Sequence, residues 1–425
     1  MMRWYLLIVF ACLWGCQRQQ EHTTSVAYLP IKLKEGYGPF EPGFGILGDN
    51  SREDPTWQGT YQPIEGVPAD WEAPEVSHMI LNTRQFVYQN YLTGNMPLAG
   101  YLSLQKSWRW TPDTARLSEA PIKCYVYVVR GYDRSAGRWA VKVDVNNNLD
   151  FGDETVLYPT AIDPKDPFAY KDPLLIQYEV YREGKIVAAT LPLVLKTFDG
   201  KLLYNFPQHA VALFGRADQP QELPVSFGTT PDYERTTILP PSKFFSAKAG
   251  QNDLVEIDNV IELNGLKYVN KGVDIYTNRL VFKPVSAVKN LHPLQVGYAF
   301  RSFVEREFGT GRIIDLNQYR GRYVYVDFWA TWCKGCVADM PALKKVYAGL
   351  DRNRVEFIGI ANDDPKRLRA FIDKHRIPWS QILATNKLLE GYNIVGFPTS
   401  VLVDPEGNII GKNLRPDELA QAVRQ

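Results

Sequence analysis

The C-terminal fold is decided by one stretch, which reads Val326-Asp327-Phe328-Trp329-Ala330-Thr331-Trp332-Cys333-Lys334-Gly335-Cys336. It overlaps a nearly continuous apolar run over 323–330, which is typical of a central strand covered on both faces. An apolar stripe at helical spacing follows, at Val337, Met340, Leu343, Tyr347 and Leu350. The two cysteines therefore lie where a buried strand gives way to a helix, within the first turn of that helix.

The Cys-x-x-Cys spacing at this position predicts redox chemistry. We expect Cys333 at the N-terminus of the helix, where unpaired N–H groups favour an anion. Such a first thiol has its pKa lowered to about 7 or below, and the thiolate is the species that attacks disulfides. The two-residue spacer lets Cys336 reach Cys333 and close the ring. A structural disulfide or half a zinc site remains the alternative, although no second Cys-x-x-Cys or His pair completes a zinc site.

Asp327 lies six residues before Cys333, inside the apolar strand. A carboxylate buried without a partner is costly, so apolar patterning alone would not place an acid there. A buried carboxylic acid can take and return the proton of the inner thiol, Cys336. The alternative is that Asp327 faces water from a sheet edge.

The rest of the C-terminal sequence alternates between strand and helix signals. A strand is predicted over 355–360, and Asp363-Asp364-Pro365 predicts a helix start. That helix is expected to reach about His375. Strands over 399–403 and 408–411 are joined by a hairpin turn at 404–407, and Pro416 opens a last helix. This order predicts an α/β layer architecture with an antiparallel edge.

Several of these stretches resemble a known family. Residues 326–336 resemble the active-site strand of thioredoxins, and Pro341 matches the helix-kinking proline of that family. Gly396-Phe397-Pro398-Thr399 resembles its cis-proline loop, whereas from sequence alone Pro398 could be an ordinary loop proline. Residues 295–300 and 315–321 resemble the lead-in of the TlpA/ResA-like branch of exported thioredoxin-family proteins. The resemblance covers less than a third of the chain. Gly335 replaces the proline common between the cysteines, so the redox potential and the direction of electron flow stay open.

The resemblance implies a thioredoxin-like α/β domain with thiol–disulfide oxidoreductase activity. Cys333 would attack, a mixed disulfide would form, and Cys336 would resolve it. Trp332, Phe397 and a cis Pro398 would present the site to an extended substrate chain. The resemblance further implies a reductase of disulfide-bearing exported proteins, recharged by a membrane thiol-reducing carrier. The redox-active disulfide itself would carry the chemistry, and no cofactor would be needed.

The first residues are predicted to be a targeting segment. Arg3 precedes an apolar run over 4–14, which is shorter than the about 20 residues that span a bilayer. The end of the run and the two residues after it, Leu13-Trp14-Gly15-Cys16, resemble the lipobox of bacterial lipoproteins. We therefore expect a signal peptide over 1–15 and a lipid anchor at Cys16, facing the periplasm or the cell surface. An ordinary secretory signal or a single transmembrane anchor are the alternatives.

Three further segments complete the predicted organisation. Residues 16–35 read as a polar tether, 36–290 as a β-rich region of one or two modules, and 291–425 as the α/β domain. Period-two alternation marks the β-rich region, for example over 122–129, 139–144, 175–180 and 278–282. The predicted fold class is thus a thioredoxin-like C-terminal domain behind a larger, mainly β region.

Composition excludes several classes of function. The chain has 425 residues and is 45% hydrophobic, which excludes wholesale disorder. Lysine plus arginine number 48 against 47 acids, and this balance argues against nucleic-acid binding as the main function. Five cysteines are too few for a disulfide scaffold of this size.

Three weaker signals lie in the β-rich region. Oxygen ligands alternate at Asp144, Asn146, Asn148 and Asp150, which could wrap calcium, but Leu149 stands where a calcium hand needs glycine. We favour a turn between strands. Cys124 shares a strand face with apolar neighbours and is interpreted as a buried apolar residue rather than a third redox thiol. Four tryptophans could line a groove for glycan or peptide but are more often core; they are Trp57, Trp71, Trp108 and Trp110.

Two hypotheses of different class follow. The first is a lipid-anchored thiol–disulfide oxidoreductase that reduces exported proteins. The second is a periplasmic or surface ligand-binding lipoprotein, in which residues 36–290 capture a ligand and the redox domain is auxiliary. A peroxidase relative is weaker, because Trp-Cys-x-x-Cys suits dithiol exchange better than peroxide attack by one isolated cysteine.

Overall fold

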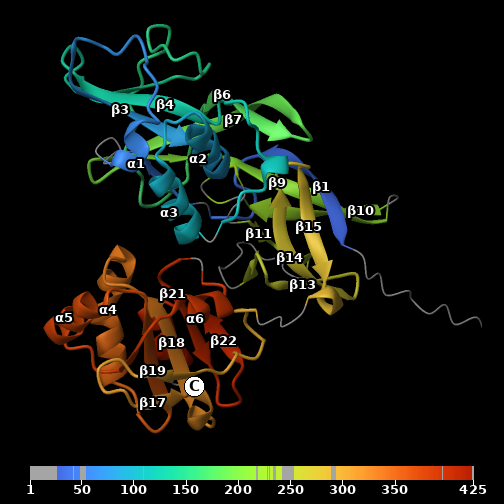
Figure 1. The fold of residues 1–425 in the computed structure, drawn as a ribbon, viewed down its shortest axis with the longest axis vertical. Helices are drawn as coiled ribbons and strands as arrows, with labels where there is room; N and C mark the ends of the chain where they lie inside the picture. Colours follow the sequence, from blue (N-terminus) through green and yellow to red (C-terminus); the bar gives the residue numbers. More distant parts are fainter. Residues whose placement is uncertain are drawn as a thin grey trace, which may run out of the picture.

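The structure is a computed structural model, and it describes residues 26–41, 43–47, 54–108, 110–216, 219–226, 228, 230–232, 236–241, 253–288, 293–394 and 396–423. Figure 1 shows an α/β part built from the C-terminal residues beside a larger part built mainly from strands. The larger N-terminal part is strongly β-rich and contains few helices. The fold class expected from the sequence is confirmed at this level.

The C-terminal part is built on a five-stranded sheet in the order β20-β19-β18-β21-β22. Its strands are β18 (Tyr323–Trp329), β19 (Val355–Ala361), β20 (Ser380–Leu383), β21 (Thr399–Val403) and β22 (Ile409–Lys412). β18 is parallel to β19 and antiparallel to β21, which gives the antiparallel edge expected from the sequence. β18 alternates between two cores. Val326 and Phe328 enter one cluster, while Tyr325 and Trp329 enter the other.

Four helices cover this sheet: α4 (Lys334–Ala348), α5 (Pro365–His375), α6 (Asn386–Gly391) and α7 (Pro416–Ala422). The predicted start of α5 is confirmed, because the Asp364 carboxylate caps it and accepts from the N–H groups of Lys366 and Arg367. β20 and α6 were not expected, since each is too short to show a period in the sequence. A further hairpin of β16 (Val304–Arg306) and β17 (Ile313–Asp315) also went unrecognised.

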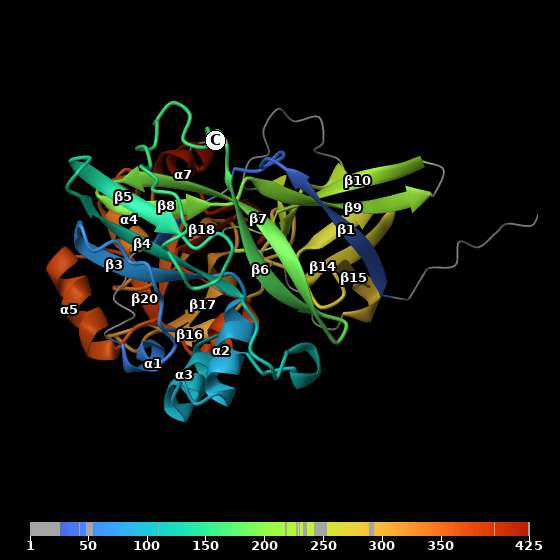
Figure 2. The same ribbon diagram turned by 90° about the horizontal axis from the view of Figure 1, so that it is seen from above.

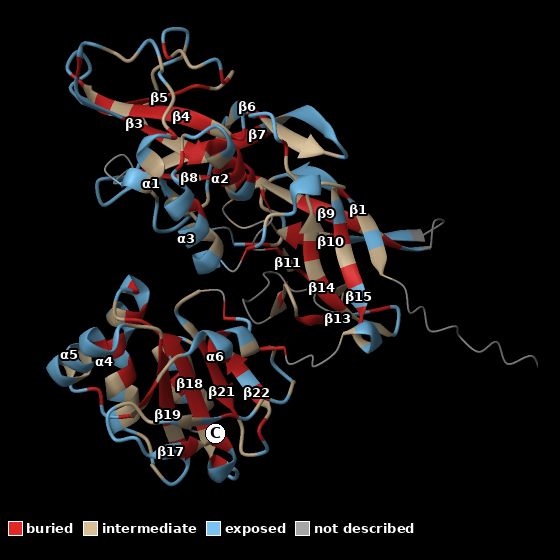
Figure 3. Cartoon of the chain, viewed as in Figure 1, coloured by how far each residue is buried: buried red, intermediate tan, exposed pale blue. Residues whose placement is uncertain are grey.

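Three antiparallel sheets make up the N-terminal part, in the orders β12-β11-β10-β9-β1-β15-β14-β13, β2-β8-β7-β6 and β3-β4-β5. Their strands are β1 (Ala27–Glu35), β2 (Gly45–Leu47), β3 (Trp71–Ile80), β4 (Tyr125–Asp133), β5 (Arg138–Val143), β6 (Leu174–Arg182), β7 (Lys185–Phe198), β8 (Lys201–Asn205), β9 (Gln208–Arg216), β10 (Gln219–Ser226), β11 (Thr237–Ile238), β12 (Val255–Glu256), β13 (Val260–Leu263), β14 (Leu266–Asp274) and β15 (Arg279–Pro284). One apolar core joins the three sheets, and Figure 3 shows buried residues concentrated along their strands.

Two features of this part differ from the sequence-based expectation. Residues 27–35, placed in the tether above, instead form β1, which pairs with β15 and then with β9. The apolar alternation of Ala27, Leu29 and Ile31 faces the core and explains the pairing. The helices α1 (Pro55–Gln58), α2 (Thr83–Leu92) and α3 (Leu98–Trp108) were also not expected.

α2 escaped recognition because its buried face is partly polar. Gln85 and Gln89 are buried and bond the main chain of a distant segment. The Gln85 side chain pairs with both backbone groups of Ser118, and Gln89 does the same with Ile122. A helix that buries amides in this way carries no apolar stripe for sequence patterning to detect.

The two parts meet near the edge of the C-terminal sheet that β22 forms. The Lys412 ammonium on β22 lies 2.6 Å from the Glu256 carboxylate on β12. The Asn393 amide donates to Asp258 over 3.2 Å. In Figure 2 the strands β3, β4 and β5 lie over β18 and β20, so part of the N-terminal region sits above the C-terminal sheet. Within the described ranges no helix is both long and apolar enough to cross a membrane.

Candidate redox site

The two cysteines lie at the first turn of α4. Cys333 is the N-cap residue of this helix, as expected, and its sulfur accepts the N–H of Cys336 over 3.1 Å. Cys333 and Cys336 are both buried and joined by a disulfide with an S–S distance of 2.07 Å. The N–H of Cys336 at the helix end therefore points at the outer sulfur, and the positive end of the helix stabilises negative charge there when the bond is reduced.

Asp327 is buried in the middle of β18, with 5% of its surface exposed. Alternate residues of a strand share one face, so Asp327 points to the same side as Tyr325 and Trp329. That side packs on α4, since Trp329 clusters with Cys336 and Met340. Asp327 thus lies on the sheet face that α4 covers, and not at a solvent-facing edge.

The surroundings of Asp327 favour its protonated form. Removal from water raises the pKa of its carboxyl to about 7, and the nearby Asp339 carboxylate adds to this rise. Asp339 itself is exposed on α4, one turn beyond Cys336. A carboxyl group that titrates near neutral pH can exchange protons with a thiol at little energetic cost.

The loop before β21 lies against the cysteine segment. The Phe397–Pro398 peptide bond is cis, as the resemblance implied. A Cβ atom placed on Gly335 would lie 3.6 Å from Pro398 Cδ, so the two loops are in near contact. The Trp332 and Phe397 rings meet edge to face, with centroids 5.6 Å apart. Trp332 is 56% exposed, so an aromatic surface lies open beside the disulfide.

Asp363 is a site residue whose role the sequence did not reveal. The sequence offered it as part of a helix start, but Asp364 alone caps α5. The Asp363 carboxylate instead accepts the N–H of Thr331 over 2.6 Å, and its side chain is buried. It therefore fixes the loop that leads into Cys333. The sequence did hold a signal for this role, because two adjacent acids precede α5 although one is enough to cap a helix.

The weaker candidates lie elsewhere in the molecule. Residues 144–154 form turns between β5 and β6, where Asp144 accepts from the N–H groups of Asn148 and Leu149. In the part of the chain that the structure describes, no group of three or more His, Cys, Asp or Glu side chains could hold a metal ion. Cys124 is completely buried. Cys16 lies outside the described residues.

The four tryptophans do not form one groove. Trp71 and Trp110 are buried in two different clusters, and the half-buried Trp57 packs against the cluster of Trp110 and against Phe86. Trp108 alone among them is exposed. The interpretation as core is confirmed for Trp71 and Trp110, whereas Trp57 is half-buried and Trp108 is exposed.

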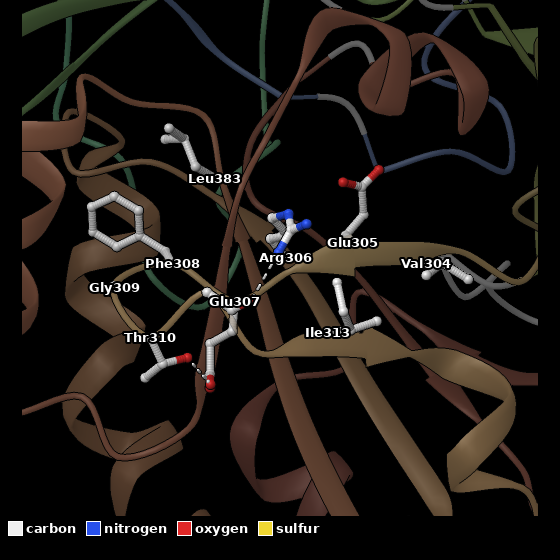
Figure 4. A pocket seen from close by; sticks show the side chains of 10 residues that line it. Val304, Glu305, Arg306, Glu307, Phe308, Gly309, Thr310, Ile313 and Leu383 are labelled. Carbon is white, nitrogen blue, oxygen red and sulfur yellow. Dashed lines mark hydrogen bonds between the residues drawn. The ribbon is translucent and has the colours of Figure 1, made fainter.

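A hollow of about 760 Å³ lies on the β16–β17 hairpin (Figure 4). Its Glu307 accepts from Arg312 and from the Thr310 hydroxyl, and these contacts lower the pKa of that carboxyl to about 2. Neither cysteine nor Pro398 lines this hollow. It is therefore a surface feature separate from the redox site.

Comparison with known proteins agrees with the geometry. Residues 296–412 match the model of the AhpC/TSA family. The thiol-disulfide oxidoreductase ResA of Geobacillus kaustophilus is 29% identical over 140 residues, covering 32% of this chain and 75% of that protein. The ResA protein of Bacillus thuringiensis subsp. konkukian is 26% identical over 119 residues, covering 28% of this chain and 68% of that protein.

A solved structure of similar sequence is the thioredoxin domain of a thiol-disulfide oxidoreductase from Bacteroides vulgatus. It is 33% identical and covers 31% of this chain and 96% of that chain, with a TM-score of 0.29. These similarities concern only the C-terminal third. That region of the chain belongs to the thioredoxin-like thiol–disulfide oxidoreductases, and Cys333 and Cys336 form its redox-active disulfide.

Proposed function

We propose that this protein reduces disulfide bonds of exported proteins by dithiol exchange. The observation that carries the proposal is the position of Cys333, whose sulfur caps α4 and accepts the N–H of Cys336. A sulfur held in this way is stabilised as a thiolate, which is the attacking species in disulfide exchange.

The reaction begins with the reduced pair. The Cys333 thiolate attacks one sulfur of the substrate disulfide, and the other substrate sulfur leaves as a thiolate that takes up a proton. Cys336 then loses its proton and attacks the Cys333 sulfur of the mixed disulfide. This breaks the bond between Cys333 and the substrate and releases the second substrate sulfur as a thiolate, which also takes up a proton. The products are a substrate dithiol and the Cys333–Cys336 disulfide, so two electrons have passed to the substrate. A membrane thiol-reducing carrier returns two electrons to the pair.

Asp327 is the proposed proton acceptor for Cys336. It is buried on the face of β18 that packs against α4, and the pKa of its carboxyl is raised to about 7. Near neutral pH a substantial fraction is ionised and can take the thiol proton as Cys336 attacks. In the reverse direction the protonated form returns it.

Trp332, Phe397 and Pro398 are the proposed contact surface for substrate. The exposed Trp332 ring supplies apolar contact area, and the loop at Phe397 and Pro398 lies against the cysteine segment. An extended substrate chain would pair with the backbone at Phe397, in the manner of an added strand. Such pairing recognises main chain rather than a particular sequence.

We further propose that a lipid on Cys16 holds the mature protein at the outer side of the cytoplasmic membrane or at the cell surface. The support is the apolar run over 4–14, which is followed by Gly15 and Cys16. Metabolic labelling with tritiated palmitate should mark the wild-type protein and leave a Cys16→Ala variant unmarked. Equal labelling of both proteins would contradict the anchor without affecting the redox proposal.

Reduction of insulin by dithiothreitol tests the redox proposal. The purified protein should accelerate insulin precipitation, and a Cys333→Ser variant should give only the uncatalysed rate. A wild-type rate no higher than that of the variant would overturn the proposal. A Cys336→Ser variant should stall the mixed disulfide and so retain its exported partners, which non-reducing electrophoresis would show as adducts that dithiothreitol releases.

A further inference from the structure

The N-terminal part carries a hollow of about 530 Å³ that the redox chemistry does not use. Ligand sites for small molecules span about 300–1,000 Å³, so its size suits one small ligand. The lining residues come from β4, β5, the segment 158–161 and the β7–β8 turn. None of them belongs to the C-terminal part.

The walls of this hollow are fixed by backbone hydrogen bonds. Val141 on β5 and Leu157 exchange two such bonds, of 2.9 and 2.8 Å. The Thr197 N–H on β7 donates to the Thr160 carbonyl over 2.9 Å, and Ile162 donates back to Thr197 over 3.0 Å. The segment 158–161 is thereby held between β5 and β7. A ligand would meet a site that is already formed, which lowers the entropy lost on binding.

The apolar part of the lining is only half covered by protein. Val141 and Leu202 are buried, whereas Trp139 is 49% exposed and Phe198 is 62% exposed. Two large aromatic side chains therefore stand open beside buried aliphatic residues. An apolar ligand body that covers these rings would remove their surface from water, which is favourable.

Two guanidinium groups supply positive charge to the same hollow. Arg130 lies over the Trp139 ring, with its Cζ 4.4 Å from the centroid, and Arg138 lies over the Tyr158 ring at 3.6 Å. Each guanidinium carries five N–H donors, so it can bond a planar anion while it contacts a ring, although the Arg138 side chain also bonds Tyr158. Neither arginine forms an ion pair with a carboxylate among the residues described.

Acidic groups in and beside the hollow offset part of this charge. Asp199, at the β7–β8 turn, is the one carboxylate of the lining. Asp133 lies close by and keeps its charge, because hydrogen bonds from the Tyr158 hydroxyl and from Ser135 favour its ionised form. Glu75 stands opposite Arg130 on β3. The lining residues themselves carry a net positive charge, from two arginines against one aspartate, which complements an anion.

We propose that this hollow binds an aromatic carboxylate. Its ring would lie against Trp139 and Phe198, and Arg130 and Arg138 would donate hydrogen bonds to its carboxylate. This binding function belongs to the N-terminal part and does not depend on disulfide exchange. It gives the ligand-capture hypothesis a specific location.

Isothermal titration calorimetry of the whole protein with naphthalene-2-carboxylate tests the proposal. The wild-type protein should bind the probe with a Kd of about 1 mM or lower, the range expected for a fragment of this size. Arg130→Gln and Arg138→Gln should each weaken binding about tenfold, because each removes a charged hydrogen bond. Arg134→Gln is the matched control. It changes an exposed arginine of the same β4–β5 hairpin that pairs with Glu72 and does not line the hollow.

Three results would overturn the proposal: no binding of the probe by the wild-type protein, equal binding of the neutral analogue naphthalene-2-methanol, or equal loss in the Arg134→Gln control. Glucuronate binding as tightly as the probe would refute the aromatic part, since that anion has no flat ring. The neutral analogue is tested on the wild-type protein, so this arm needs no folded variant. Insulin reduction by each variant should equal the wild-type rate, which separates this site from the redox site.

Discussion

The two parts of this molecule bury cysteine in opposite surroundings. Cys336 lies in the first turn of α4, bonded to Cys333 at the positive end of the helix. Cys124 is completely buried beside β4, and its thiol donates to the Gln89 amide oxygen over 3.9 Å. Burial raises the pKa of the Cys124 thiol far above its ordinary value. The comparison shows that the backbone around a thiol, more than burial itself, decides whether it can react.

The sheets explain why the two surroundings differ. β18 is a central strand that runs directly into α4, so its end delivers a residue to the helix N-terminus. β4 pairs with β3 and β5 in an antiparallel sheet, and no helix starts at its ends. A parallel strand followed by a helix thus creates a polar end that an antiparallel hairpin lacks.

The largest expected effect comes from exchanging the reactive thiol. Cys333→Ser should lower the rate of insulin reduction about a thousandfold or more, because serine does not form mixed disulfides under these conditions. Cys124→Ala should leave that rate within twofold of wild type. A comparable loss of rate in both variants would contradict the difference in reactivity between Cys333 and Cys124.

The second largest effect on activity is expected when the buried carboxyl of Asp327 is removed. Asp327→Asn should lower the turnover of protein disulfides about a hundredfold, because asparagine cannot take the Cys336 proton. The sign of the pH dependence follows from a pKa of about 7: the ionised base is scarce below this pH and abundant above it. The wild-type rate should therefore rise as pH increases through 7, and the variant should lack this inflection. An inflection retained in Asp327→Asn would assign it to another group.

A smaller effect is expected at the exposed aromatic ring. Trp332→Ala should raise the KM for insulin about threefold to tenfold, because aromatic contacts of this kind contribute about 0.5–1.5 kcal/mol. Reduction of a small disulfide such as oxidised glutathione should change little. Trp139→Ala removes an equally exposed tryptophan from the N-terminal part and serves as the control. If both variants raise the KM alike, Trp332 has no special contact with substrate.

The smallest effect should arise at Asp339. Its carboxylate helps to raise the pKa of Asp327, so Asp339→Asn should move the pH midpoint of the reaction to lower pH without changing the maximal rate much. Asp373→Asn, on the exposed side of α5, should leave the midpoint unchanged. A shift to higher pH in Asp339→Asn would show that electrostatic repulsion is not what links the two acids.

The sequence predicted the redox site well because its signals are local. The Cys-x-x-Cys spacing, the apolar run before it and Asp327 all lie within the fourteen residues 323–336, and one strand followed by one helix fixes their arrangement. Asp363 and the cis bond at Pro398 approach from other parts of the chain. Of these two features, only the cis bond at Pro398 lies in a motif that could be recognised from the sequence.

The N-terminal part was much harder to predict because its contacts are distant in sequence. β1 pairs with β9 and β15, so residues near 30 depend on partners near 210 and 280. Alternating strands look alike in sequence, and pairing among them is not encoded locally. The same reason hid the hollow, since Arg130, Thr160 and Phe198 come together only when β4, the segment 158–161 and β7 have taken their places. The tryptophan that faces it, Trp139, was not among the four singled out.

The bond from Thr331 to Asp363 has a consequence for how the protein cycles. This carboxylate fastens the peptide in front of Cys333 to the segment that begins α5, while α4 holds the peptide behind it. We therefore expect the loop that leads into Cys333 to keep its position when the disulfide is reduced and formed again. A docking partner would then meet the same surface in the oxidised and in the reduced protein.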